Sequence, residues 1–200
     1  MLSITNSVIT TAPQPTAARV PARPTTPSAG FALRIELAPI VDVAGLMRAV
    51  MATGADVRAM STADDGSRVM TVNCTGIGQQ DAVRAAIGTT PGARARSIED
   101  ATFAMHRGGK LRVAPKAPIA GPDELAMAYT PGVGRVSAAI AADPSLSWTF
   151  TGRSNTVAVL TDGSAVLGLG NIGPEAAMPV MEGKAALFHQ FAGIDAYPIC

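Results

Sequence analysis

The sequence predicts an α+β protein in which a small antiparallel-sheet domain precedes an α/β region. Across residues 31–100, strand-like and helix-like hydrophobic patterns follow one another in the order β-α-β-β-α-β. After residue 100, amphipathic helical patterns alternate with apolar runs and glycine-rich turns. Hydrophobic residues make up 48% of the 200 residues, which is enough for a core.

The composition excludes several classes of function. Charged residues make up 16% of the chain and the net charge is +1, so no strong field attracts nucleic acid or anionic lipid. Every apolar stretch is interrupted before the roughly 18 to 20 residues that a membrane span needs. Two cysteines are too few for a disulfide scaffold and favour a reducing compartment, so we expect a cytoplasmic protein with no nucleic-acid or membrane partner.

Residues 1–30 are predicted to be a disordered leader. They hold five of the fifteen prolines together with many Thr and Ala residues, and they lack acidic residues. A transit peptide is the alternative, but the prolines would interrupt its amphipathic helix.

Residues 31–100 form the first predicted domain. "FALRIELA" alternates apolar and polar residues as a half-buried strand does, and Asp42 is placed to cap the helical pattern that ends at Gly54. An Asp-Gly turn lies between two strand-like runs and predicts a hairpin. The remaining predicted elements are those hairpin strands at 55–62 and 67–75, a helix at 79–87 and a strand at 93–98.

This order of elements is the ferredoxin-like, or split βαβ, arrangement. In element order and length, residues 31–100 resemble an ACT domain, a regulatory module that often binds amino acids at paired interfaces. The resemblance implies a possible small-molecule effector. The alternative is a domain used only for dimerisation or docking, since this fold has many functions.

A connecting helix is predicted to follow, because Ser97 and Asp100 have the spacing of a capping box and Gly108 ends the pattern. The pair Glu99 and Asp100 suggests a metal site at first sight. Acidic residues are also favoured in a first helical turn, and we prefer this second interpretation.

Chemistry-bearing residues cluster in 101–200. In "AYTPGVG", Thr130 is expected to cap a helix with Pro131 in its first position, and Asp143 precedes the proline that ends it. Tyr129 would then lie just outside the amino terminus of this helix. Its ring is either a packed structural group or an acid in catalysis.

The segment "GLGNIG" at 168–173 matches the dinucleotide-binding pattern G-x-G-x-x-G. We expect it to follow a hairpin centred on Asp162, and we expect Pro179 to interrupt the helix after it. Asp195 precedes a strand-like run instead of ending a strand. These features argue against a nucleotide site, which remains an alternative testable by NAD binding.

Lys184 has apolar residues three, four or seven positions away on one helical face. Burial would disfavour its charged form and allow a neutral amine to accept a proton. The alternative is a flanking lysine whose ammonium reaches water.

The motifs "AYTPGV", "TDGSAVLGLGNIGPEAAMPVMEGKA" and "FAGIDAYPI" resemble the amino-terminal, malate-binding domain of the malic enzyme family over about residues 105–200. The resemblance implies that Tyr129 is the general acid and Lys184 the general base. It implies oxidative decarboxylation of malate to pyruvate and CO2 with reduction of NAD or NADP, assisted by Mg²⁺ or Mn²⁺. Ser164, Ala165 and Val166 stand where some relatives carry an arginine, so no arginine is assigned.

The family's metal ligands and nucleotide-binding domain follow the lysine, so we assign no metal-binding and no cofactor-binding residue to this chain. Residues 101–200 are therefore expected to be a partial malic enzyme N-terminal domain. We expect the 200-residue chain alone not to turn over malate, and we expect a homo-oligomer by resemblance. The rival hypothesis is a non-catalytic regulatory or ligand-binding protein that keeps a remnant of the malate domain.

Overall fold

A computed structural model describes residues 26–200, which divide into two compact units. The first unit ends at Arg112 and the second begins at Val113. Most of the predicted leader, residues 1–25, lies outside the described residues. Its last positions do not belong to a leader, because strand β1 (Ser28–Leu37) begins at Ser28.

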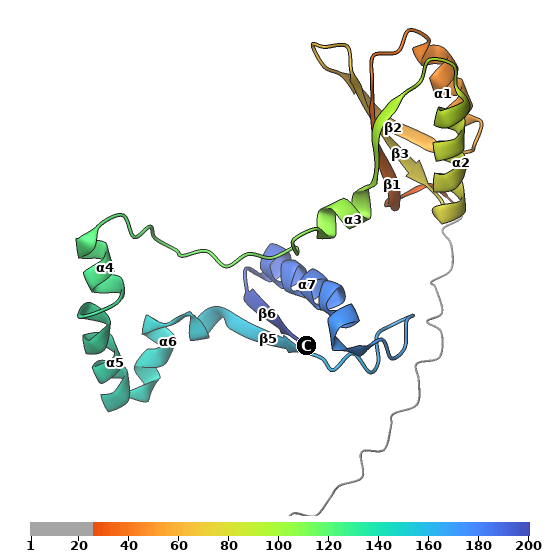
Figure 1. Ribbon diagram of the computed structural model, residues 1–200. Helices are drawn as coiled ribbons and strands as arrows, with labels where there is room; N and C mark the ends of the chain where they lie inside the picture. The colour runs from red at the N-terminus through yellow and green to blue at the C-terminus, as the bar shows by residue number, and fades with distance from the viewer. Residues whose placement is uncertain (1–25) are drawn as a thin grey trace, which may run out of the picture. The chain divides into compact units, whose positions relative to one another are not determined.

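The first unit has the predicted order of elements and a four-stranded antiparallel sheet (Figure 1). The strands lie in the order β2-β3-β1-β4, and the helices α1 and α2 lie side by side on one face of the sheet. The bounds are α1 (Val43–Met51), β2 (Asp56–Thr62), β3 (Arg68–Cys74), α2 (Ile77–Thr89) and β4 (Ala95–Asp100).

The core of the first unit lies between the sheet and the two helices. Leu33, Ile35 and Leu37 of β1 are fully buried, which confirms the alternation predicted for this strand. They pack with residues from β3 and from both helices, namely Met70, Val72, Cys74, Leu46, Val50, Val83 and Ile87. Met51, the last residue of α1, is 59% exposed.

Local signals set the ends of these elements as predicted. The Asp42 side chain accepts a hydrogen bond of 2.7 Å from the Gly45 N–H and caps α1. The β2–β3 hairpin closes with a bond from the Ala63 N–H to the Ser67 carbonyl, and Gly66 has a φ of 77° that favours glycine in the turn.

The helix after the sheet, α3 (Ala101–His106), starts later than the capping-box interpretation implied. Ser97 lies inside β4 and is not a cap. Asp100 is the N-cap instead, and its carboxylate accepts bonds from the Thr102 and Phe103 N–H groups. The strand continues through Ser97 because it pairs with Glu36 of β1.

The second unit consists of short helices followed by a strand-helix-strand segment (Figure 1). Strand β5 pairs with β6 in parallel, and α7 connects them. The hairpin expected around Asp162 is therefore wrong, because the partner of β5 is a strand that begins 35 residues after β5 ends. The bounds are α4 (Pro122–Ala128), α5 (Gly132–Ala142), η1 (Pro144–Leu146), α6 (Ser147–Phe150), η2 (Gly152–Asn155), β5 (Thr156–Leu160), α7 (Gly173–Ala192) and β6 (Asp195–Ile199).

The second unit buries few apolar side chains of its own. Its buried hydrophobic residues are Val166, Ala177, Met181 and Ala185. Many large ones are exposed, including Leu125, Met127, Trp148, Phe150, Leu167, Leu187 and Phe191. Exposed apolar side chains are typical of an interaction surface where they lie together, as Leu187 and Phe191 do on α7.

No helix among residues 26–200 is long and apolar enough to cross a membrane.

Candidate functional site

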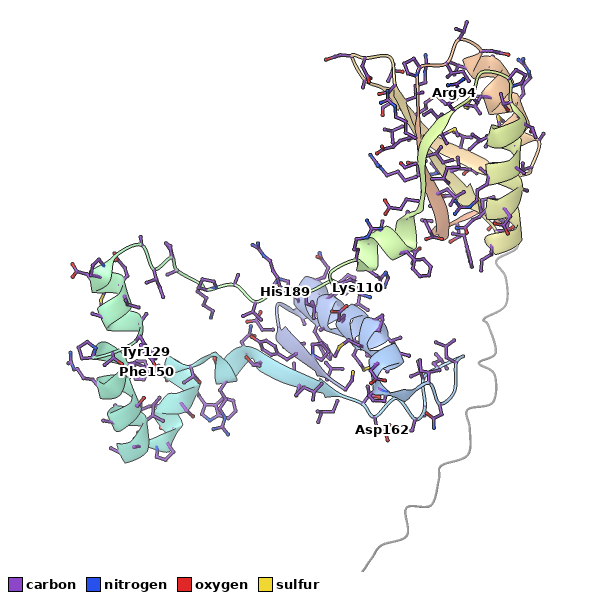
Figure 2. The ribbon with its side chains drawn as sticks, in the orientation of Figure 1. Arg94, Lys110, Tyr129, Phe150, Asp162 and His189 are labelled. Atoms are coloured by element: carbon purple, nitrogen blue, oxygen red, sulfur yellow. The ribbon has the colours of Figure 1, made fainter. Side chains whose placement is uncertain are left out.

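Tyr129 lies in the turn between α4 and α5. It is the C-cap of α4, where its N–H donates to the Leu125 carbonyl, and its own carbonyl accepts a bond of 2.7 Å from the Val133 N–H. The backbone is thus held on both sides while the side chain remains 68% exposed. The phenol is presented to solvent from a well-defined turn (Figure 2).

The helix after Tyr129 begins differently from the prediction. The Thr130–Pro131 peptide bond is cis, and Pro131, not Thr130, is the N-cap of α5. At Gly132 a Cβ atom would lie 2.5 Å from the Ala126 carbonyl oxygen, so this position has room only for glycine. The motif "YTPG" is therefore a tight connection between two helices.

Lys184 lies on α7, but not on a buried stripe. The buried side of α7 is formed by Ala177, Met181 and Ala185, and the Lys184 side is exposed. Of the two interpretations of the sequence, this agrees with a flanking lysine whose ammonium reaches water and not with a buried amine, since the neighbouring Leu187 is also 56% exposed. A shallow apolar groove contains Lys184, Leu187, Phe188, Phe191 and Ala192.

Pro179 does not interrupt α7, which continues from Gly173 to Ala192. A proline removes one backbone hydrogen bond from a helix interior. The helix tolerates that loss because both its neighbouring turns continue and its buried side packs on β5 and β6.

The glycine-rich loop before α7 folds onto itself. The Ser164 N–H donates to the Asp162 carboxylate at 2.9 Å, and hydrogen bonding from the Ser164 side chain and backbone lowers the pKa of Asp162. Val166 and Gly170 exchange two backbone bonds of 2.8 Å. The Gly163 carbonyl accepts a bond of 3.1 Å from the Ile172 N–H, which closes the loop.

This closure bears on the nucleotide alternative. The order strand, glycine loop, helix and parallel strand does match a dinucleotide-binding unit, so two sequence arguments against it do not hold. However, a pyrophosphate needs free N–H groups at the helix amino terminus. Here the Ile172 N–H already donates to Gly163, and a Cβ on Gly163 would lie 2.0 Å from the Gly173 oxygen, so the loop backbone lies against the first residue of α7.

The structure does not bring Tyr129 and Lys184 together. Within residues 26–200, neither side chain has a hydrogen bond or an ion pair to the other or to a further described residue. Tyr129 belongs to the α4–α5 pair, whereas Lys184 belongs to the β5-α7-β6 segment. The sequence placed both residues in one domain but gave no information on the distance between them.

Metal ligands are also not gathered in the described part of the chain. Among residues 26–200, no group of three or more His, Cys, Asp or Glu side chains could hold a metal ion. Glu99 pairs with Arg107, and Asp100 accepts a bond from Gln80. Both carboxylates therefore have structural partners.

Two contacts that hold α7 were not anticipated from the sequence. The Asn155 side-chain amide donates at 2.8 Å to the Gly193 carbonyl, where α7 ends in a left-handed glycine. His189 lies 3.5 Å from the Asp195 carboxylate. Only the Gly193 helix-end signal could have indicated this junction.

Comparison with known proteins identifies the second half of the chain. The family model for "Malic enzyme, N-terminal domain" matches residues 108–200. Residues 108–200 are a malic enzyme N-terminal domain. This malic domain includes Tyr129, the glycine-rich loop and Lys184, as the sequence motifs predicted.

Relatives of the malic domain are malic enzymes of several bacteria. The NAD-dependent malic enzyme of Geobacillus stearothermophilus is 44% identical over 165 residues, which are 80% of this chain and 34% of that protein. The NAD-dependent malic enzyme of Rhizobium meliloti is 54% identical over 93 residues, 46% of this chain and 12% of that protein. The chain is also similar to a crystal structure of the NAD-dependent malic enzyme of Thermotoga maritima, with 55% sequence identity and a TM-score of 0.48. The match covers 49% of this chain and 28% of the Thermotoga chain.

The extent of these matches differs between the two parts of the chain. The Geobacillus match is longer than the malic domain and therefore reaches into the first unit, whereas the Rhizobium match has only the length of the malic domain. The chain spans about a third of the Geobacillus relative.

Proposed function

We propose that the malic domain supplies the acid and the base of an enzyme that oxidises and decarboxylates malate to pyruvate and CO2 with NAD or NADP. The observation that carries this proposal is that Tyr129 and Lys184 both lie inside the family match at residues 108–200. Relatives named as NAD-dependent and NADP-dependent malic enzymes support the reaction class.

The two side chains suit the two proton transfers of this reaction. The amine of Lys184, when neutral, takes the proton from the C2 hydroxyl of malate, and the phenol of Tyr129 gives a proton to the enolate that decarboxylation leaves. NAD or NADP, when bound, would supply the acceptor for the hydride of C2. We derive no step through a metal ion, because residues 26–200 provide no cluster of ligands for one.

Both groups must reach one substrate, so the proposal requires Tyr129 and Lys184 to approach each other. Each group has exposed apolar neighbours that another surface would bury: Met127 beside Tyr129 is 69% exposed, and Phe191 in the Lys184 groove is 81% exposed. Covering this surface would exclude water from both groups and strengthen their electrostatic interactions with malate. We propose a homo-oligomer as the form in which the site works.

For the first unit we propose a ferredoxin-like, ACT-like regulatory domain that binds a small-molecule effector. The sheet order β2-β3-β1-β4 and the two helices on one face support the fold. The match with the Geobacillus malic enzyme supports its association with a malic domain. A domain that serves only in dimerisation or docking is the alternative, and effector binding distinguishes them.

A chimera provides the test of the catalytic proposal. Residues 108–200 would replace the corresponding segment of the Geobacillus malic enzyme, and malate-dependent reduction of NAD or NADP would be measured with Mn²⁺ present. We expect activity in the chimera and a decrease in kcat of about 10²- to 10⁴-fold in Lys184→Ala and Tyr129→Phe.

The matched control is Lys116→Ala, which removes another lysine of the malic domain. It should leave kcat within a factor of about two, as expected for an exposed side chain away from the chemistry. An active chimera that keeps its kcat in Lys184→Ala would refute the role of Lys184. The 200-residue chain assayed alone should give no turnover, and turnover that Lys184→Ala abolishes would contradict that expectation.

A non-catalytic binding protein is the second candidate, because the Tyr129 and Lys184 side chains make no hydrogen bond or ion pair with each other among residues 26–200. This candidate predicts that the chimera is inactive and that the 200-residue chain binds a specific ligand. Calorimetry with malate, amino acids and NAD would detect such binding. Heat from NAD alone would instead support the nucleotide alternative at residues 168–173.

A further inference from the structure

Gln80 is a polar residue of α2 whose side chain lies in the interior of the first unit. Among residues 26–200 it is the one polar or charged residue classed as buried, with 4% of its surface exposed. Its side-chain amide lies on the inner side of α2 and donates to two acceptors, the Phe31 carbonyl at 3.3 Å and the Asp100 carboxylate at 2.7 Å. A buried amide is tolerated only while such bonds exist.

Asp100 has a second role at the same time. While one carboxylate oxygen accepts from Gln80, the other accepts from the Thr102 N–H at 2.9 Å and the Phe103 N–H at 3.3 Å. These two amides are the first orphan donors of α3. One carboxylate thus joins α2, the end of β4 and the start of α3.

The helix that depends on this cap is marginal. α3 has six residues and no buried side chain, whereas isolated helices below about 12 residues are unstable in water. Besides the cap, it is held by the bond from the Thr102 hydroxyl to the Gly30 carbonyl at 3.0 Å, by the ion pair of its C-cap Arg107 with Glu99, and by contact with β1 and β4. α3 is therefore an element that can form or unfold without disturbing the core.

We propose that Gln80 and Asp100 form a conformational coupling through which the position of α2 controls whether α3 is formed. While α2 holds Gln80 against the sheet, Asp100 is oriented to cap α3. A displacement of α2 withdraws the amide, frees Asp100 to rotate, and unfolds the helix that leads to the malic domain. The coupling is intrinsic to the first unit and does not depend on the proposed activity.

Residue-resolved hydrogen exchange on the 200-residue chain tests this coupling. Gln80→Met keeps the size of the side chain and removes the donor. We expect the Thr102 and Phe103 amides to exchange about fivefold faster, the factor that a lost N-cap typically represents, with less change at the core amides of Ile35 and Met70.

The matched control is Asp81→Met, a neighbouring and exposed position of α2, which should leave exchange in α3 unchanged. Asp100→Ala should speed exchange in α3, and the double variant should be no faster than Asp100→Ala because both act through one cap. Unchanged exchange in α3 of Gln80→Met, or an equal acceleration at Ile35 and Met70, would overturn the proposal.

The reciprocal measurement remains decisive if Gln80→Met does not fold. Asp100→Ala deprives the Gln80 amide of its nearer acceptor and should speed exchange at Val83 and Arg84, in the turn of α2 that follows. Exchange in α2 that is identical in Asp100→Ala and the unmodified chain would show that the two helices are not coupled.

Discussion

Replacing Ile35 by alanine should destabilise the first unit strongly and leave the second unit unaffected. Ile35 is fully buried in β1, between β3, where it pairs with Met70, and β4, where it pairs with Ile98. The substitution removes three carbon groups at about 0.8 kcal/mol each, and the cavity that remains increases the loss to about 3 to 4 kcal/mol.

That loss is large relative to the expected stability. At about 0.05 to 0.15 kcal/mol per residue, residues 26–112 would have a free energy of unfolding of about 4 to 13 kcal/mol. The variant should therefore unfold at a much lower urea concentration. The matched control is Ile77→Ala, because Ile77 is 65% exposed at the start of α2 and its loss should change the free energy by less than about 0.5 kcal/mol.

The chain has a convenient probe for separating the two units. Trp148 is its single tryptophan and lies in the second unit, where Arg153 stacks 4.8 Å from the ring centroid. Urea unfolding would be followed by far-UV circular dichroism, which reports on both units, and by Trp148 fluorescence. In Ile35→Ala the dichroism transition should shift while the fluorescence midpoint stays constant. Equal shifts in both signals, or a cost no greater than that of Ile77→Ala, would refute the reasoning.

Three further predictions concern reactivity, pH and proteolysis. Burial raises the pKa of the Cys74 thiol, so iodoacetamide at pH 8 should modify the exposed Cys200 and spare Cys74; mass spectrometry would show equal labelling if the core were open. Ser164 lowers the pKa of Asp162, so this carboxylate favours the folded loop at neutral pH and loses that contribution as the pH falls through its lowered value. The Ser164 amide signal should therefore titrate below the ordinary 3.8 in NMR spectra, and a midpoint at or above 3.8 would contradict the bond. Among the described residues, limited trypsin should cut first between residues 107 and 116, which contain four cations and no strand, and leave a resistant fragment with the first core; earlier cleavage inside β1 or β3 would disprove this.

The first unit was predicted well because its signals are local. The alternation through Leu33, Ile35 and Leu37, the Asp42 cap and the Asp-Gly turn each act within a few residues, and each agrees with the final fold. Gln80 escaped notice because a polar residue on a helix gives no sign of its burial until β1 and β4 are placed beside it.

The second unit was predicted less well because its pairings are not local. Two apolar runs around Asp162 have the pattern of a hairpin, and nothing nearby indicates that β5 pairs with β6 instead. For the same reason the apolar stripe around Lys184 left both burial and exposure of the amine open. Hydrophobic periodicity indicates which side of a helix is apolar, but not whether another element covers it.

By itself the sequence determined the order of elements in the first unit, the Asp42 cap of α1, and the motifs that place residues 108–200 among malic enzyme N-terminal domains. Tertiary structure decided the parallel pairing of β5 with β6, the closure of the glycine loop over the start of α7, and the exposure of Tyr129 and Lys184. The physical reason is one of range: caps, turns and periodicity involve residues a few positions apart, whereas strand partners and burial depend on segments far apart in the chain.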